Sequence, residues 1–581
     1  MLDGAQLDLA GQDALYEEYD AALAVLDANK DRWARLPVAE RIRLLSGMKD
    51  GIKKVAKGWA EEAARKKGLK PGTAVAGEEW VAGPYACMAG CNGLISTLSQ
   101  MEGKKFVDHL HTRELVTGQL GVQVLPHSIW DRLLLSGVSA EVWMQKGVNK
   151  ANLKSHVAIA YDTPENQREG KVALVLGAGN VNAITPLDVL QKLILENQVV
   201  LLKMNPVNDY LTDYYRIAMK PFIDEGFLRI VKGDARGGAY LCDHPIIEEL
   251  HITGADTTHD AIVWGVGEEG KKNRAAGTPK NAKRFTSELG GVGPTIVVPG
   301  PWSAADIRFQ AENIATMKLH NSGHNCVAVQ ALIMPKGWNK GARLIDAVKK
   351  VAATSTRPAW YPGAEQRIET HKANSGKVVE TVNRGKIAPA LVITEISEVD
   401  LNTSCEVFAP AFGIKELEAS DPASYLEAAI DYANNELAGT LGGQILIHPR
   451  TIRKIGKKRF EEIVAKMRYG TIGINGWCGL GFLITACPWG AFPGHTIKDV
   501  GSGIGTVHNS FMLEDTERCV IRAPWRPFPR GLLSGQFTLL PRPPFFITNK
   551  RQHKIGEALT GFQYKPSWFK LPKIFYHALL G

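Results

Sequence analysis

Residues 171–203 carry the clearest structural signal of the chain, KVALVLGAGNVNAITPLDVLQKLILENQVVLLK. Two short apolar runs, 172–176 and 199–203, have the Val and Leu content of strands that are buried on both faces. A glycine turn follows the first run, and the spacing over 186–196 indicates a helix. Strand, turn, helix and strand in this order predict a parallel sheet with right-handed crossovers, and therefore an α/β fold.

The same alternation continues toward the C-terminus. A helical pattern covers 209–224, and two further strands are predicted at 228–231 and 249–253. Because a parallel sheet binds nucleotides at the carboxyl ends of its strands, we expect a cofactor to lie beyond those ends.

The glycine turn is a weak nucleotide signal when it is taken alone. Gly177-Ala-Gly179 fits the start of a dinucleotide motif, but Asn182 stands where the third glycine of that motif belongs. An ordinary strand-to-helix turn is an equal alternative. We retain Gly177 as a candidate cofactor contact.

The remaining regions extend this block on both sides. Pro71-Gly72 ends the first helical pattern. The regions in order are helices over 13–68 and on to about 101, an irregular stretch over 104–170 that we expect to hold strands or an inserted arm, a second α/β pattern over 294–475, a glycine-rich loop over 488–509 and a tail.

Composition and charge exclude several classes of protein. With 581 residues, 45% hydrophobic and 22% charged, the chain is not disordered, collagen-like or a disulfide scaffold. The net charge is +9, but residues 518–581 contain 11 Lys/Arg and one acidic residue, which leaves 58 Lys/Arg against 59 Asp/Glu elsewhere. A body of net charge −1 argues against a nucleic-acid-binding surface, because phosphate recognition needs clustered cations.

The cysteines and the N-terminus indicate a cytoplasmic protein. The eight cysteines form no CxxC pair and no Cys/His cluster at zinc spacing, so we expect reduced thiols and no metal site. Cys87 and Cys91 stand four residues apart on a predicted helix, and we expect two core cysteines in preference to a metal or redox pair. Met1 to Asp20 has six acidic residues and no basic one, unlike a signal or transit peptide, and no run of 18 apolar residues predicts a membrane span.

Five dispersed motifs are more informative than the glycine turn. They are Asn180, Lys203, Glu288-Leu-Gly-Gly291, Asn321-Ser-Gly-His-Asn-Cys326 and Glu406-Val-Phe-Ala-Pro410. In this order, and with 38 residues from Glu288 to Cys326, they make the chain resemble the aldehyde dehydrogenase superfamily. The resemblance covers about residues 13–515 and is weak over 104–170.

This resemblance implies three catalytic residues. Cys326 would be the nucleophile that attacks an aldehyde carbonyl, which requires a thiol pKa below about 8.5 for useful thiolate at neutral pH. Asn180 would donate its side-chain amide to the developing oxyanion together with the backbone N–H of Cys326, with Asn182 as the fallback. Glu288 would activate water to hydrolyse the thioester.

The resemblance also implies a cofactor, NAD or NADP. Lys203 and Glu406 would hold its two riboses, and the turn after the strand that ends near Thr253 would meet the pyrophosphate. The candidate cofactor contacts are Gly177, Lys203, Thr253, Gly254, Ala255, Glu406 and Phe408.

Several positions depart from the family pattern. Pro206 stands where a Glu often binds the 2′-hydroxyl, so the sequence leaves NAD and NADP both open. Ala255-Asp256 replaces a Ser and places a negative charge beside the pyrophosphate position. His324 replaces a Gln two residues before Cys326; it could lower the thiol pKa, but we favour a packing role.

We therefore predict a Rossmann-type parallel-sheet cofactor domain, an α/β catalytic domain and a C-terminal extension. The function would be NAD(P)-dependent oxidation of an aldehyde to a carboxylic acid by a homo-oligomer, a dimer or tetramer. Two alternatives stay open: a long-chain acyl-CoA reductase, and a catalytically impaired fold that acts as a membrane or assembly component. The predicted cofactor domain covers 1–290, including the N-terminal helices and the irregular arm at about 104–170, and the predicted catalytic domain covers 291–480. Residues 481–517 would lead back to the cofactor and oligomerisation region, and the extension would cover 518–581.

The extension combines basic and aromatic residues. It has 8 of the 30 prolines and 11 of the 45 aromatic residues of the chain. We favour an arm that packs on its own or a neighbouring subunit, with peripheral contact to an anionic membrane surface as the second hypothesis. Nucleic-acid binding is the least favoured.

Overall fold

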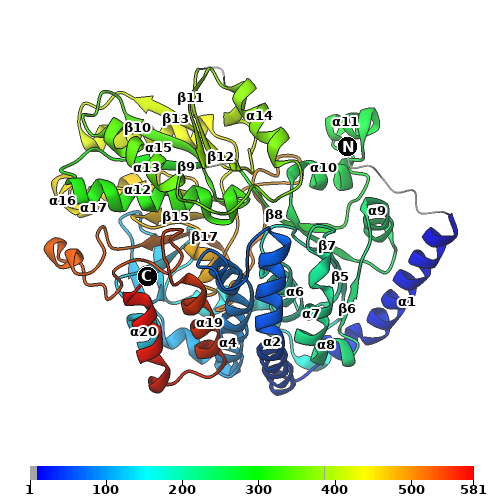
Figure 1. Cartoon of the computed structure of the whole chain (residues 1–581). Helices are drawn as coiled ribbons and strands as arrows, with labels where there is room; N and C mark the ends of the chain where they lie inside the picture. Colours follow the sequence, from blue (N-terminus) through cyan, green and yellow to red (C-terminus); the bar gives the residue numbers. More distant parts are fainter. Residues whose placement is uncertain (1–8, 385–386, 399) are drawn as a thin grey trace.

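Two sheets and their covering helices form the body of the protein (Figure 1). The structure is a computed structural model that describes residues 9–384, 387–398 and 400–581. The first eight residues of the acidic start therefore lie outside the described residues.

The smaller sheet contains the block from which the fold was predicted. Its order is β16-β8-β7-β4-β5-β6, and all neighbours are parallel except β16 and β8. Its strands are β4 (Val172–Leu176), β5 (Val199–Lys203), β6 (Leu228–Val231), β7 (Glu249–Gly254), β8 (Arg284–Leu289) and β16 (Gly503–Ile504). The connecting helices are α6 (Ile184–Leu190), α7 (Thr212–Ala218), α8 (Lys220–Asp224), α9 (Ala235–Asp243), α10 (Asp256–Trp264) and α11 (Gly267–Ala276). The predicted α/β fold is confirmed.

The larger sheet has eleven strands in the order β1-β2-β3-β17-β15-β14-β9-β10-β13-β12-β11. Its strands are β1 (His111–Glu114), β2 (Leu120–Leu125), β3 (Ser139–Met144), β9 (Gly293–Val297), β10 (Val329–Pro335), β11 (Lys377–Arg384), β12 (Ile387–Glu395), β13 (Ala411–Leu417), β14 (Gly442–Leu446), β15 (Thr471–Ile474) and β17 (Thr516–Arg522). The helices of this part are α12 (Ala304–Leu319), α13 (Gly341–Ala352), α14 (Ala364–Asn374), α15 (Pro422–Glu436), α16 (Pro449–Ile455), α17 (Lys457–Ala465) and α18 (Leu480–Leu483).

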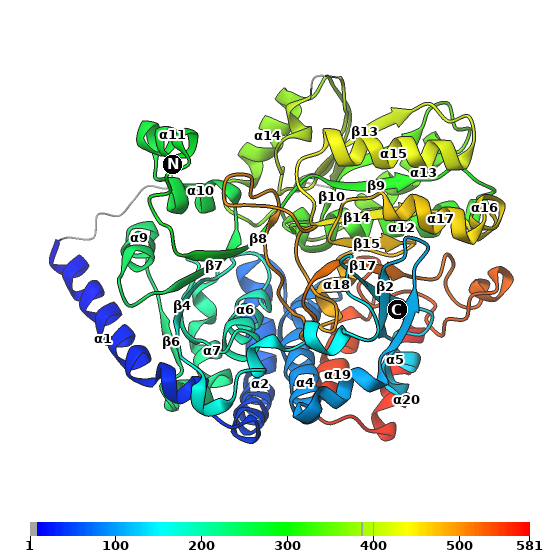
Figure 2. The ribbon, with the colours of Figure 1, turned by 180° about the vertical axis from the view of Figure 1, so that it is seen from behind.

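The irregular stretch over 104–170 provides the antiparallel edge of this larger sheet. β1, β2 and β3 form a meander, and β3 pairs with β17. Figure 2 shows β2 near β17 at this edge. β17 spans the predicted boundary at residue 517, so the extension leaves the sheet only after Arg522. The charge count placed this boundary too early because Arg518 and Arg522 belong to the strand.

The remaining helices lie toward the two ends of the chain. They are α1 (Leu9–Ala34), α2 (Val38–Lys66), α3 (Gly77–Trp80), α4 (Ala86–Leu98), α5 (Ile129–Leu134), α19 (Gln552–Tyr564) and α20 (Leu571–Leu579). Helix α1 packs on the smaller sheet beside β5 and β6, whereas the N-terminal helices α2, α3 and α4 pack against the C-terminal helix α19. Helix α19 lies against α3 and α4, and Figure 1 shows its position beside α4. A Cβ on Gly77 would lie 2.3 Å from the backbone of Gln552, so this approach needs glycine.

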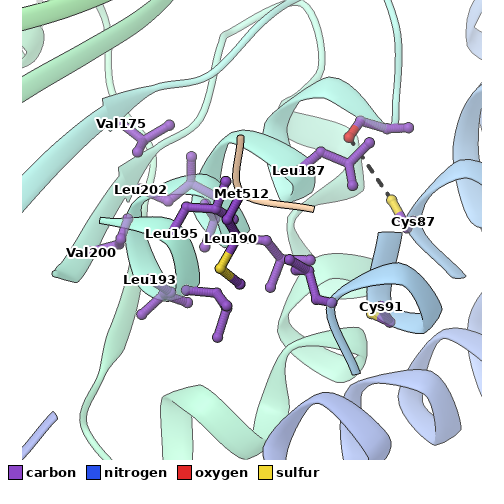
Figure 3. Close-up of a cluster of buried hydrophobic side chains, with 14 of the residues drawn as sticks. Cys87, Cys91, Val175, Leu187, Leu190, Leu193, Leu195, Val200, Leu202 and Met512 are labelled. Atoms are coloured by element: carbon purple, nitrogen blue, oxygen red, sulfur yellow. Dashed lines mark hydrogen bonds between the residues drawn. The ribbon is translucent and has the colours of Figure 1, made fainter. Parts of the chain in front are cut away.

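The predicted core cysteines lie in the largest hydrophobic cluster, around α6 and β5 (Figure 3). Cys87 and Cys91 are fully buried free thiols, and burial raises the pKa of both. Within the described part of the chain, no three His, Cys, Asp or Glu side chains are grouped to hold a metal ion.

Most of the extension packs on its own chain, as the favoured interpretation expected. Trp525, Phe546 and Phe562 are buried. Arg526 donates two hydrogen bonds to the buried Asp306 carboxylate, at 2.6 and 2.8 Å. Across residues 9–384, 387–398 and 400–581, no helix has the length and apolar character needed to cross a membrane.

Candidate active site

One cavity of about 1110 Å³ lies between the strand ends of the smaller sheet and loops that connect elements of the larger sheet. The ten candidate residues all line it: Gly177, Asn180, Lys203, Thr253, Gly254, Ala255, Glu288, Cys326, Glu406 and Phe408. They come from strand ends and loops that are far apart in the sequence, and the fold brings them together.

Cys326 follows a strained turn at the end of α12. Asn321, Ser322 and Gly323 have φ of 53°, 55° and 79°, a left-handed run that only the glycine adopts without strain. The Ser322 hydroxyl fixes this run by donating to the carbonyl of Pro358 at 2.7 Å. Six of the eight cysteines are buried, whereas Cys326 is partly accessible at the cavity.

Asn180 stands between β4 and α6 and faces the catalytic loop. Its side-chain amide donates to the carbonyl of His324 at 3.0 Å, and the second amide hydrogen is left for another acceptor. The fallback candidate Asn182 is fully buried, donates to Glu79 at 2.9 Å and does not line the cavity. The geometry therefore favours Asn180 over Asn182.

Glu288 is a buried carboxyl at the end of β8. Burial raises its pKa to about 7, while hydrogen bonds from the Trp489 indole and the Cys326 thiol act in the opposite direction. The Trp489 Nε1–H donates to Oε1 at 2.8 Å. A carboxyl with this pKa can both accept and release a proton near neutral pH.

The thiol of Cys326 differs from the expectation of a lowered pKa. Burial raises its pKa well above the usual value, and the nearby carboxyls of Glu288 and Glu406 raise it further because they disfavour a second negative charge. The thiol is therefore neutral in the resting site, and a base must take its proton before it can act as a nucleophile.

His324 does not supply a positive charge to offset this effect. Its Nδ1 donates to the carbonyl of Phe408 at 2.8 Å, and Nε2 accepts from the backbone N–H of Tyr361 at 3.4 Å, which is the neutral tautomer. Burial lowers its pKa to about 3. The favoured packing interpretation agrees with this geometry.

The opposite end of the cavity is formed by β5, β7 and α10. Lys203 ends β5, and its pKa is lowered by burial. The Thr253 hydroxyl donates to the buried Asp188 at 2.8 Å, so it is directed away from the cavity. Asp256, at the start of α10, accepts from the Thr257 amide at 2.7 Å and occupies one of the N–H groups of that terminus.

Glu406 lies against the glycine pair that follows Glu288. A Cβ on Gly290 would lie 2.2 Å from Glu406 Oε2, so this close approach requires a glycine. Burial raises the pKa of Glu406 to about 8, which Lys318 partly offsets. Within the described residues, Glu406 Oε1 has no hydrogen-bond partner.

Comparison with known proteins identifies this arrangement. The model of the aldehyde dehydrogenase family matches residues 187–490, more than half of the chain. The chain belongs to the aldehyde dehydrogenase family. A curated member, coniferyl aldehyde dehydrogenase of a Pseudomonas species, is 26% identical over 245 residues. That match covers 37% of this chain and 44% of the relative, less than half of its length.

Solved members of the family share the fold. A mutant of aldehyde dehydrogenase C from Pseudomonas syringae, in complex with NAD⁺ and octanal, is 16% identical with a TM-score of 0.57. The two chains are covered to 87% and 88%. The NADP-dependent glyceraldehyde-3-phosphate dehydrogenase of Bacillus halodurans, in complex with NADP, is 17% identical with a TM-score of 0.56, and coverage is 87% and 91%.

Sequence analysis missed several residues at this site. Tyr361 and Arg367 line the cavity, and Trp489 contacts Glu288, but none of them belongs to a quoted motif. Lys318 stands three residues before Asn321, where the quoted motif begins, and the sequence around it does not indicate that its side chain is buried. These residues reach the site by tertiary contacts that sequence spacing does not encode.

Proposed function

We propose that the protein oxidises an aldehyde to a carboxylic acid with NAD or NADP, through a thioester on Cys326. The observation that carries this proposal is that one cavity gathers a partly accessible thiol, a buried carboxyl of pKa about 7 and a side-chain amide that makes a single hydrogen bond as donor among the described residues. These are the groups that nucleophilic attack, water activation and oxyanion stabilisation need.

The cavity residues fit a nicotinamide dinucleotide. The unpartnered carboxyl oxygen of Glu406 would accept from one ribose, and Lys203 would bind the hydroxyls of the other. The backbone at Gly254 and Ala255, before α10, would meet the pyrophosphate. When bound, the nicotinamide supplies a hydride acceptor. Because Pro206 lines the cavity where an acidic residue would select NAD, the choice of NAD or NADP stays open.

The first half of the reaction forms the thioester. Glu288 in its carboxylate form takes the proton of Cys326, and the sulfur forms a bond to the aldehyde carbon. The carbonyl oxygen becomes an oxyanion that accepts from the Asn180 amide and the Cys326 backbone N–H. The C–H hydrogen would then leave as hydride, for which a nicotinamide held by Lys203 and Glu406 would supply the acceptor, and the restored carbonyl would leave an acyl thioester on Cys326.

The second half releases the acid. After Glu288 has lost its proton to solvent, it takes a proton from a water molecule that attacks the thioester carbon. The C–S bond breaks, Cys326 leaves as a thiolate and recovers a proton, and the carboxylic acid departs. Members of the family that pass the acyl group to coenzyme A generally lack this glutamate, so Glu288 favours hydrolysis over acyl-CoA reduction.

A panel of aldehydes tests the proposal. Purified protein is incubated with short, long and aromatic aldehydes and with NAD or NADP, without coenzyme A, while reduced cofactor and acid are measured. We expect both products in equal amounts, and none with Cys326→Ala. Turnover only in reverse, from an acyl-CoA, would support the reductase. No turnover in either direction, with any aldehyde or acyl-CoA and either cofactor, would support the impaired fold.

We also propose peripheral contact of the extension with an anionic membrane, which Trp568, Phe569, Tyr576 and Leu579 would make. These side chains are exposed, Phe569 to 95%. Partial burial lowers the pKa of Lys570, and charge repulsion from the nearby Lys53 and Lys565 lowers it further, so cations border the exposed aromatic residues. Aromatic residues beside lysines suit the interface of anionic lipid.

Vesicle flotation tests this contact. We expect the protein to float with phosphatidylglycerol vesicles and not with phosphatidylcholine vesicles, and the double variant Phe569→Ser/Leu579→Ser to lose flotation. Leu533→Ser is the matched control, because Leu533 is 78% exposed elsewhere in the extension. Equal behaviour of the double variant and the wild type would refute the contact. A cytoplasmic location and a homo-oligomer also remain proposals, the second of which light scattering tests.

A further inference from the structure

Four charged side chains are buried together behind the catalytic loop. Lys67 pairs with Glu79 at 2.9 Å, and Arg357 pairs with Glu78 at 2.6 Å and with Glu79 at 3.1 Å. Each of the four residues is at most 3% exposed. Their formal charges sum to zero, and none of them belongs to the residues proposed to touch substrate or cofactor.

Lys67 directs all of its hydrogens toward the site. Besides Glu79, its Nζ donates to the backbone carbonyl of Asn180 at 2.9 Å and to Asn321 Oδ1 at 3.3 Å. An ammonium group has three hydrogens, and three acceptors take them. Lys67 therefore joins the loop of the proposed oxyanion donor to the loop of the nucleophile.

The glutamates complete this connection. Glu78 accepts from the backbone N–H of Asn321 at 2.9 Å, and Glu79 accepts from the Asn182 side chain at 2.9 Å. Asn321 in turn donates to the carbonyls of Asn180 at 3.1 Å and His324 at 3.0 Å. The same four charged residues therefore hydrogen-bond both the segment that carries Asn180 and the loop that leads to Cys326, the two segments that flank the proposed oxyanion position.

The turn at Asn321 explains why such a support is needed. Asn321 and Ser322 have positive φ without being glycine, and strained backbone of this kind persists only where its surroundings determine it fully. The charged cluster holds Asn321 in this conformation, because Glu78 binds the backbone N–H of Asn321 and Lys67 binds its side chain. A buried ion pair is by itself weak evidence for stability, so a role in positioning accounts for the cluster better.

We propose that Lys67, together with Glu79, is a positioning residue that fixes the Asn180 amide relative to Cys326. The expected effect on catalysis rests on the proposed function. The fixed position of the Asn180 amide relative to Cys326 does not depend on that function. Loss of the pair would move the amide and the Cys326 loop without altering the residues that face the cofactor.

The test uses a variant that keeps the cluster neutral. Lys67→Met alone leaves an excess negative charge in the core, whereas Lys67→Met/Glu79→Gln removes one charge of each sign. The matched control is Lys192→Met/Glu196→Gln, because Lys192 is fully buried and pairs with Glu196 at 2.8 Å beside Glu249, at the opposite end of β7 from the cavity.

We expect kcat of the double variant to fall on the order of 10²-fold, the loss typical of one oxyanion donor, with KM for the cofactor within twofold of wild type. The control should lower the melting temperature to a similar degree but keep kcat. Wild-type kcat in the folded double variant, or an equal loss in the control, would overturn the inference.

A second measurement does not depend on turnover. Alkylation of Cys326 by iodoacetamide is followed by peptide mass spectrometry, which separates it from the exposed Cys405. We expect the rate at Cys326 to change at least about fivefold in the double variant and to stay unchanged in the control. If the wild type oxidises no aldehyde, the proposed function fails; an unchanged alkylation rate in the double variant refutes the positioning role.

Discussion

Replacement of Trp489 by Phe tests the role of Glu288 without touching the carboxyl itself. The indole N–H donates to Glu288 Oε1 at 2.8 Å, and this bond holds the pKa of Glu288 below the value that burial alone would give. Phe keeps most of the aromatic volume and removes the donor. The carboxylate then loses a hydrogen bond, so its pKa must rise.

The size of the shift follows from the strength of that bond. A hydrogen bond to a charged group is worth about 1.5–3 kcal/mol, and one pKa unit corresponds to about 1.4 kcal/mol, so the shift is about one to two units. From a starting pKa of about 7 the rise leads to about 8 or above. At pH 7 about half of Glu288 is ionised in the wild type and about a tenth or less in the variant, a loss of about fivefold or more.

The assay is kcat as a function of pH from 5.5 to 9.5, with saturating aldehyde and cofactor. Because the base acts in its carboxylate form, activity rises with pH through its pKa. We expect the acidic limb of Trp489→Phe to move upward by at least about one unit and the two rates to converge at high pH. Trp525→Phe is the control, because its indole nitrogen has no hydrogen-bond partner among the described residues.

Two outcomes would refute this reasoning. An unchanged limb would mean that Glu288 is not the group that titrates in the rate-limiting step. A loss of equal size at every pH would mean that Trp489 acts by packing and not through its N–H.

Three further predictions follow from the same structure. Asn180→Ala should lower kcat about 10²- to 10³-fold and leave KM for the cofactor unchanged, which steady-state kinetics checks. Lys203→Met should raise KM for the cofactor about fivefold to tenfold, as loss of one hydrogen bond predicts, with little effect on kcat. Asp306→Asn should cost about 1–3 kcal/mol in urea unfolding at pH 7, because Arg526 loses its charged hydrogen-bond acceptor. Arg526 holds the folded pKa of Asp306 below its unfolded value, so wild-type stability is present above pH ~4 and lost as pH falls through the folded pKa, whereas the variant should lack this loss.

The fold was predictable because its strands are short apolar runs with clear ends. β4 and β5 are buried on both faces, and this leaves continuous Val and Leu in the sequence. The arm was not predictable in the same way. β1, β2 and β3 have four to six residues each, and β17, which joins β3 to the rest of the sheet, lies more than 370 residues further along the chain.

Part of the site was predictable for a geometric reason. Carboxyl ends of parallel strands meet at one edge of a sheet, so residues at those ends, such as Lys203 and Thr253, converge whatever lies between them. Trp489 and Lys67 act through contacts over 201 and 113 residues. Their environment exists only after folding, and no spacing rule reports it.

The raised pKa of the thiol changes how the site must operate. If Cys326 were already a thiolate in the resting site, its negative charge would repel the neighbouring carboxylate. Here burial and the carboxyls of Glu288 and Glu406 raise the pKa of Cys326, so in the mechanism proposed above the thiolate would form only when Glu288 takes its proton. Glu288 would then have to release that proton before it could activate water, and a pKa of about 7 allows both directions at neutral pH. Trp489 holds this pKa down from the value that burial would give, so under this proposal it would affect both halves of the reaction.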